Sequence, residues 1–280
     1  MVNFKNISNL SRPLDTDYPS NVFILVISSA SLLGFGIYSW LSGESALWSI
    51  VFGAKAFLSV FLAWALCREI DPDRPLAAGL AAIGQVIVIW VTNVPNLLLT
   101  FWALIIFRVL NRSTGLKAGL ADIVLVSALS MWLGFELAWV IPGVSAVILL
   151  LDGLMLNPNR KNLVPGILLI GEAIYLVVNN PDIWIGFVDY PAKLGLVLGI
   201  SLTFLFGISR YRTVTSGNDK TNEPLSPSRV QLTQFMAVSV ALLLPLWTRV
   251  YGFHQSTTFW PVLGGSSFIN LIGFFSTRFF

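Results

Sequence analysis

The 280-residue chain has a formal net charge of +3, with 55% hydrophobic and 11% charged residues, one cysteine and one histidine. A soluble domain of this length would have too little polar sequence to cover its surface. The cysteine and histidine counts exclude an internal disulfide and a zinc site of Cys and His, and the scattered basic residues exclude a nucleic-acid-binding stripe. The composition therefore predicts an all-α, polytopic membrane protein.

The N-terminal segment 1–20 precedes the first apolar run. It contains Lys5, Arg12, Asp15 and Asp17, and it lacks a short apolar core that ends in a small-residue cleavage site. A removable signal peptide is therefore not expected. We predict that 1–280 is a single integral membrane domain and that 1–20 is cytoplasmic.

Nine apolar runs are long enough to cross about 30 Å of hydrocarbon. They predict a bundle of about nine transmembrane helices at 21–41, 46–67, 75–93, 95–110, 118–134, 136–156, 163–179, 193–209 and 231–252. The tail 258–275 is either a tenth span or an interfacial helix, and its central Gly264-Gly265 favours the interfacial alternative. The polar stretch 210–229 has no apolar periodicity and predicts a flexible cytoplasmic loop.

The distribution of lysine and arginine predicts the orientation, because cytoplasmic loops of membrane proteins are enriched in both. With the N-terminus inside, thirteen of the seventeen basic residues fall on cytoplasmic segments or their membrane edges: Lys5, Arg12, Arg68, Arg74, Arg108, Arg112, Lys117, Arg160, Lys161, Arg210, Arg212, Lys220 and Arg229. We therefore predict a cytoplasmic N-terminus.

Five charges stand in the seven residues 68–74, within the loop predicted after the second span. The acids Glu69, Asp71 and Asp73 are not required by membrane orientation and need another explanation. One alternative is a solvated turn, in which Arg68 and Arg74 neutralise the acids. The other is a cation site, because clustered carboxylates at a membrane surface can hold Mg²⁺ together with substrate phosphates.

The stretch "REIDPDRPLAAG" at 68–79 resembles the first signature of the UbiA superfamily of intramembrane prenyltransferases. In that family a span ends in N-D-x-x-D-x-x-x-D, often D-R-E-I-D, and R-P-L-x-x-G follows shortly after. The chain departs from the pattern, because Ala63, Trp64 and Cys67 stand where the family carries Asn-Asp and the middle aspartate. Only Asp152, in "LLLDGLMLNPNRKN", stands where the second acidic motif is expected.

The resemblance implies a UbiA-like fold and a polyprenyl diphosphate bound through Mg²⁺ at the cytoplasmic face. It implies metal ligation by Glu69, Asp71, Asp73 and Asp152, and catalytic roles for Asp71, Glu69 and Asp152 in transfer to an aromatic or quinone-type acceptor. The diphosphate would be contacted by basic residues through charge-assisted hydrogen bonds. These residues are Arg68, Arg74, Arg160 and Lys161.

Two ionisable residues fall within predicted spans, Lys55 in the second and Glu172 in the seventh. Charges at such depth are costly and usually face a cavity or a partner. Three alternatives stay open: a buried Lys55–Glu172 pair that fixes packing, a polar lining of a substrate or ion path, and a protonated Glu172 without a partner.

Three functions fit these features. The first is a membrane prenyltransferase whose partners are membrane lipid, an isoprenoid diphosphate and a hydrophobic acceptor. The second is a small-solute transporter with a path marked by Lys55, Glu172 and Glu136. The third is a non-catalytic membrane subunit or lipid-binding scaffold descended from the first.

Overall fold

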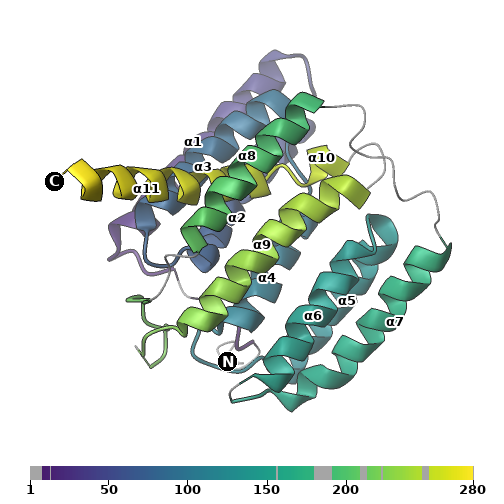
Figure 1. Ribbon diagram of the computed structural model, residues 1–280. Helices are drawn as coiled ribbons and strands as arrows, with labels where there is room; N and C mark the ends of the chain where they lie inside the picture. Colours follow the sequence, from purple (N-terminus) through teal and green to yellow (C-terminus); the bar gives the residue numbers. More distant parts are fainter. Residues whose placement is uncertain are drawn as a thin grey trace, which may run out of the picture.

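The computed structural model describes residues 8–12, 14–155, 157–179, 191–208, 213–221, 223–247 and 252–279 (Figure 1). Within these ranges every secondary-structure element is a helix, apart from a single β-bridge that joins Gly217 to Pro224. The helices are α1 (Pro19–Leu41), α2 (Ala46–Ile70), α3 (Pro75–Thr92), α4 (Leu97–Asn111), α5 (Leu120–Glu136), α6 (Val140–Leu154), η2 (Arg160–Asn162), α7 (Leu163–Asn179), α8 (Pro191–Ile208), α9 (Pro227–Trp247), α10 (Gly252–Gln255) and α11 (Phe259–Phe279).

Every predicted apolar run overlaps one of these helices, and the all-α prediction is confirmed for the described residues. Four helical stretches are long and apolar enough to cross a membrane, namely α1, α2, α3 and the continuous stretch Arg160–Asn179. Shorter apolar stretches occupy α4, α6, Gly195–Ile208 and Phe259–Ile272. The fold is therefore that of a helical membrane protein, and the number of nine spans stays a prediction.

Helix α2 extends beyond its predicted end at residue 67 and stops at Ile70. Its last turn contains Arg68 and Glu69, which the sequence placed in a loop; that placement is wrong. The backbone N–H of Asp71 still donates to the carbonyl of Cys67, at 2.8 Å. Asp71 itself has φ −133° and ψ 73°, because the following Pro72 disfavours helical geometry in the residue before it.

Two groups of helices lie on either side of a central pair (Figure 1). Helices α1, α2 and α3 pack together on one side with α11, and α5, α6 and α7 pack together on the other. Helices α4 and α9 contact each other and connect the two groups, since both touch α2 and α6. The C-terminal ends of α2 and α4 lie next to each other, since Arg108 Nε donates to Glu69 Oε1 at 2.9 Å.

Helix α11 crosses the bundle instead of running parallel to its neighbours (Figure 1). It packs on α3 at Gly265, where an added Cβ would lie 2.6 Å from the carbonyl oxygen of Ala77. Gly265, the second glycine of the pair in the tail, therefore allows α11 to approach the backbone of α3 closely. The interfacial location of this segment stays a prediction.

The polar stretch before α9 folds back on itself over the described residues 213–221 and 223–226. Asn218 organises the turn: its N–H donates to the carbonyl of Glu223 at 2.9 Å, and its side-chain oxygen accepts from the N–H of Thr221 at 2.7 Å. We call residues 213–221 the 213–221 loop. Residues 210–212 and 222 lie outside the described residues, and the flexibility of the stretch stays a prediction.

Candidate functional site

Glu69 joins three parts of the chain through its Oε1 atom. Its side chain is fully buried and accepts from Arg108 Nε at 2.9 Å and from Arg12 Nη1 at 3.1 Å. Arg108 belongs to α4, and Arg12 belongs to the segment before α1. Glu69 therefore neutralises two arginines that the linear sequence does not place near it.

Asp71 is also fully buried, directly after α2. Its Oδ2 accepts a hydrogen bond from the hydroxyl of Ser266 on α11 and forms an ion pair with Arg74 Nη1 at 3.4 Å. Arg74 in turn donates to the side-chain oxygen of Asn270. The predicted ligand Asp71 and the predicted diphosphate contact Arg74 thus tie α11 to the start of α3.

Asp73 fixes the 213–221 loop against the loop between α2 and α3. Its carboxylate accepts from the N–H groups of Thr215, at 3.0 and 3.1 Å, and Ser216, at 2.7 Å. Burial alone would raise the pKa of Asp73, but these hydrogen bonds lower it below its ordinary value. Asp73 is therefore a deprotonated hydrogen-bond acceptor at neutral pH.

Asp152, at the end of α6, lies in a separate buried cluster. Its Oδ1 contacts Arg229 Nη1 at 2.6 Å and Arg112 Nη2 at 2.7 Å, and its Oδ2 accepts from Asn162 Nδ2 at 3.0 Å. The arginines come from the N-terminal end of α9 and the C-terminal end of α4. Asp152 therefore connects three helices and does not line the pocket described below.

The predicted Mg²⁺ ligands Glu69, Asp71, Asp73 and Asp152 each have partners of their own in this structure, and the Mg²⁺ site stays a prediction. Within the described residues no three His, Cys, Asp or Glu side chains come close enough together to hold a metal ion. Arginines pair with Glu69 Oε1 and with Asp152 Oδ1, and backbone amides donate to Asp73. The structural alternative for residues 68–74 holds in part: Arg74 pairs with Asp71, but Glu69 and Asp71 are buried and not solvated.

The predicted pair of Lys55 and Glu172 does not form. Lys55 is exposed on α2, whereas Glu172 is buried on α7 and both of its carboxylate oxygens lack a hydrogen-bond partner. Glu172 Oε1 lies against Gly134, where an added Cβ would be 2.6 Å away. Of the three alternatives, the ion pair is absent from the structure, and Glu172 fits that of a carboxyl group without a partner.

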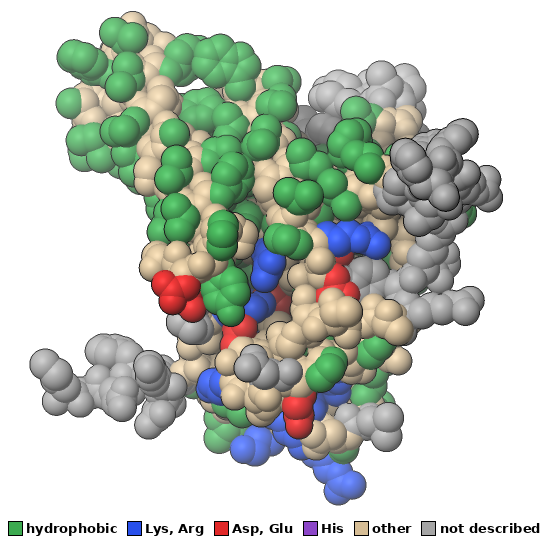
Figure 2. All heavy atoms as spheres, turned by 90° about the vertical axis from the view of Figure 1, so that its left-hand side faces the viewer, with side chains coloured by type: hydrophobic (Ala, Val, Ile, Leu, Met, Phe, Trp, Pro, Cys, Tyr) green, Lys and Arg blue, Asp and Glu red, His purple; other side chains and the backbone are tan. Residues whose placement is uncertain are grey.

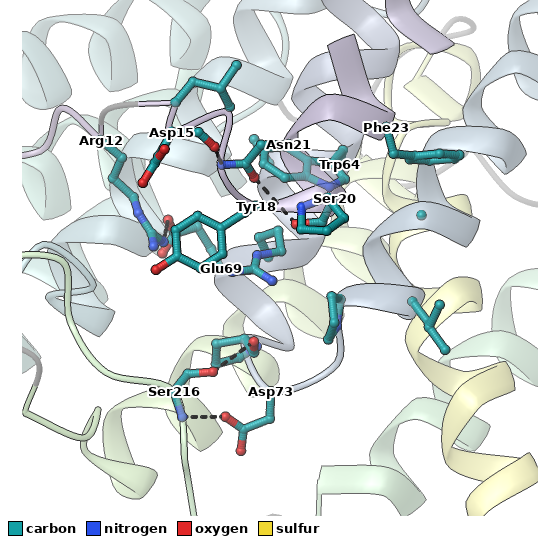
Figure 3. Close-up of a pocket in the computed structure, with 18 of the residues that line it drawn as sticks. Arg12, Asp15, Tyr18, Ser20, Asn21, Phe23, Trp64, Glu69, Asp73 and Ser216 are labelled. Carbon is teal, nitrogen blue, oxygen red and sulfur yellow. Dashed lines mark hydrogen bonds and ion pairs between the residues drawn. The ribbon is translucent and has the colours of Figure 1, made fainter. Parts of the chain in front are cut away.

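A cavity of about 1200 Å³ lies where α1, α2, α3 and α11 meet the N-terminal segment and the 213–221 loop (Figure 3). Helix α2 supplies one continuous face to it, because the lining residues recur at helical spacing. These residues are Phe61, Trp64, Ala65, Arg68 and Glu69. The cavity is hereafter called the pocket.

The pocket has a polar end and an apolar end. Arg12, Tyr18 and Glu69 gather at the polar end, and Phe23 lies at the other (Figure 3). Besides Phe23, which marks the apolar end, the apolar side chains that line the pocket include Phe61, Leu76, Leu80, Ile83 and Phe268. Figure 2 shows the surface hollowed where charged side chains meet the hydrophobic part of this face. The pocket is therefore suited to an amphipathic ligand.

Arg68 is the predicted diphosphate contact that the structure places in the pocket. It is half-buried on α2 and forms no ion pair with a carboxylate of the described residues. Arg160 and Lys161 are exposed in η2 and do not line the pocket. Of the four predicted diphosphate contacts, Arg68 is therefore the one whose guanidinium group lines the pocket and could bind a ligand there.

Arg12 and Arg108 are pocket residues that the sequence did not identify as ligand contacts. Burial alone would lower the pKa of Arg12, but the neighbouring Glu69 and Asp219 carboxylates raise it above its ordinary value. The spacing of Phe61, Trp64, Ala65 and Arg68 was a signal that could have revealed the α2 face. No local pattern predicts Arg108, because only the tertiary fold brings α4 to Glu69.

No family model, curated protein or solved structure matches this chain. The fold is that of a helical membrane protein, and the pocket is lined by both charged and apolar side chains. A ligand for the pocket must be inferred from the residues that line it.

Proposed function

We propose that this protein binds an isoprenoid diphosphate in the pocket, with the diphosphate at Arg68 and the hydrocarbon chain along the apolar end. The single observation that carries this proposal is that Arg68, which forms no ion pair with a carboxylate of the described residues, follows the aromatic residues Phe61 and Trp64 on the same pocket-lining face of α2. Along α2, Phe61 precedes Arg68 by seven residues, or about 10 Å. A ligand with a compact anionic head and an apolar chain matches that order.

Electrostatics supports an anionic headgroup. Arg12 and Arg108 reach the polar end together with Arg68, and their shared partner Glu69 is fully buried. Guanidinium groups bind phosphate oxygens through two parallel hydrogen bonds, which are stronger than bonds between neutral groups. A phosphate at Arg68 would supply the direct ion pair that this residue does not form with a carboxylate of the described residues.

We propose binding without prenyl transfer, which is the third of the functions considered for the sequence. Prenyl transfer in the family that the sequence resembles relies on Mg²⁺ to neutralise the leaving diphosphate. The carboxylates Glu69, Asp71 and Asp152 are held by arginines or a hydroxyl, so we assign them structural roles. A carrier or regulatory subunit for isoprenoid diphosphates would need the pocket alone.

We further propose nine spans with the N-terminus in the cytoplasm, as the distribution of basic residues predicts. The polar end of the pocket would then face the cytoplasm, where soluble diphosphates are found, and the apolar end would face the bilayer. The transporter hypothesis receives less support, because neither Lys55 nor Glu172 lines this pocket.

Replacement of Arg68 tests the proposed function. The Arg68→Ala variant is expected to bind a fluorescent isoprenoid diphosphate about 10- to 100-fold more weakly, because a hydrogen bond to a charged group contributes about 1.5–3 kcal/mol. The measurement is equilibrium binding to purified protein in detergent micelles. Binding by the wild type is expected to be unchanged in EDTA, since arginines hold the headgroup in this proposal.

Arg160→Ala is the matched control, because it removes the same type of side chain from an exposed position outside the pocket. It is expected to bind like the wild type. Equal weakening in both variants would show that binding follows net charge and not the pocket. Loss of wild-type binding in EDTA would contradict the metal-free headgroup site.

A further inference from the structure

Arg12 makes an ion pair across the polar end of the pocket. Its Nη2 and Nε atoms each lie 2.6 Å from a different carboxylate oxygen of Asp219, and its Nη1 lies 3.1 Å from Glu69 Oε1. Arg12 thus uses both edges of its guanidinium group, one on the 213–221 loop and one on α2. Both Arg12 and Asp219 line the pocket.

The two partners of Arg12 differ in how easily they can be replaced. The Glu69 side chain is fully buried, so release of Arg12 would remove one of its two arginine partners without admitting water. The side chains of Arg12 and Asp219 are 23% and 25% exposed. The carboxylate of Asp219 can therefore be rehydrated when Arg12 is released, which offsets part of the lost ion pair.

The segments on both sides of this ion pair are held by other contacts. Near Arg12, the N–H of Asn9 donates to Asp122 Oδ2 at 3.0 Å, and Leu10 O accepts from Arg108 Nη1 at 3.1 Å. In the 213–221 loop, the N–H of Asp219 donates to the carbonyl of Ser113 at 3.2 Å. Separation of Arg12 from Asp219 therefore does not require either segment to unfold.

We infer that Arg12 is a further headgroup-binding residue, which Asp219 holds in place until the anionic head of the ligand replaces it. This inference rests on the proposed function, because the replacing group is the phosphate of the bound diphosphate. Arg12 keeps its contact with Glu69 and exchanges a carboxylate for a phosphate. Asp219 is then a competitor of the ligand.

Substitution of Asp219 tests this inference. If Asp219 competes with the ligand, its removal raises the affinity; if Asp219 only supports the site, its removal lowers the affinity. In the Asp219→Asn variant the ligand no longer displaces a carboxylate, and we expect about two- to fivefold tighter binding of the fluorescent isoprenoid diphosphate. Arg12→Ala is expected to weaken binding. Glu223→Gln is the matched control, since it removes an acidic charge from an exposed position four residues away.

If Asp219→Asn binds the ligand no more tightly than Glu223→Gln does, the replacement of Asp219 by the phosphate at Arg12 is contradicted, even if the wild type binds. Absence of binding by the wild type would overturn the proposed function and this inference together, so the two failures can be told apart. Hydrogen exchange of residues 8–12 without ligand checks the fold of the variants. If hydrogen exchange in Arg12→Ala is the same as in the wild type, weaker binding by this variant results from the lost contact between Arg12 and the ligand.

Discussion

The Asp152→Asn variant is expected to have a free energy of unfolding about 3–5 kcal/mol lower than that of the wild type. The wild-type carboxylate lies between Arg112 and Arg229, whose side chains are only 12% and 8% exposed. Asparagine keeps the shape but removes the negative charge, so Arg112 and Arg229 would stay buried without the carboxylate that lies between them in the wild type. Because α4, α6 and α9 meet here, the loss is expected to affect the whole bundle.

Chemical denaturation in detergent micelles measures this effect. Glu136→Gln is the control, because Glu136 is exposed at the end of α5, and it is expected to change stability by less than about 0.5 kcal/mol. The double variant Asp152→Asn/Arg229→Met is expected to recover part of the loss, since it removes one of the stranded charges. A loss below 1 kcal/mol for Asp152→Asn would contradict the role of this cluster.

The Gly265→Ala variant is expected to lose about 1–3 kcal/mol of stability through overpacking. An alanine Cβ at this position would lie 2.6 Å from the carbonyl oxygen of Ala77 and 3.0 Å from the backbone nitrogen of Ala81. Both atoms belong to the backbone of α3 and cannot move as a side chain can. Helix α11 would have to shift away from α3, and Ser266 would then separate from Asp71.

The neighbouring Gly264 provides a matched control in the same helix. An added Cβ there meets no atom within 4 Å. Gly264→Ala is therefore expected to stabilise the protein, because alanine is favoured over glycine in a helix interior by about 1 kcal/mol. If α11 packs on α3 as described, the thermal unfolding temperature falls in Gly265→Ala and rises in Gly264→Ala. Equal effects would contradict this crossing.

The positions of the helices could be predicted from hydropathy, because apolar runs and the prolines at 19 and 75 mark where α1 and α3 begin. The end of α2 could not be predicted in the same way. Its last turn carries Arg68 and Glu69, which are favourable inside a protein only because Arg12 and Arg108 come from distant segments. Such compensation depends on tertiary contacts and leaves no local signal.

The candidate site was predicted in part. The sequence predicted Arg68 as a phosphate contact, which the structure places in the pocket, and it drew attention to Glu69, Asp71 and Asp73. It offered Arg74 as a partner of the acids, but it did not predict the distant partners of these carboxylates, such as Arg108 for Glu69 and Ser266 for Asp71. A motif of acidic residues is therefore ambiguous until the groups that face it are known.

Photo-crosslinking tests the central claim most directly. An isoprenoid diphosphate with a photoreactive group in its hydrocarbon chain is irradiated with the wild-type protein, and labelled peptides are identified by mass spectrometry. We predict labels on the apolar end of the pocket, in peptides that contain Phe23, Phe61, Ile83 or Phe268, and competition by unlabelled isoprenoid diphosphate. Labels confined to α5, α6 and α7, or labels that excess ligand does not reduce, would contradict the assignment of this pocket.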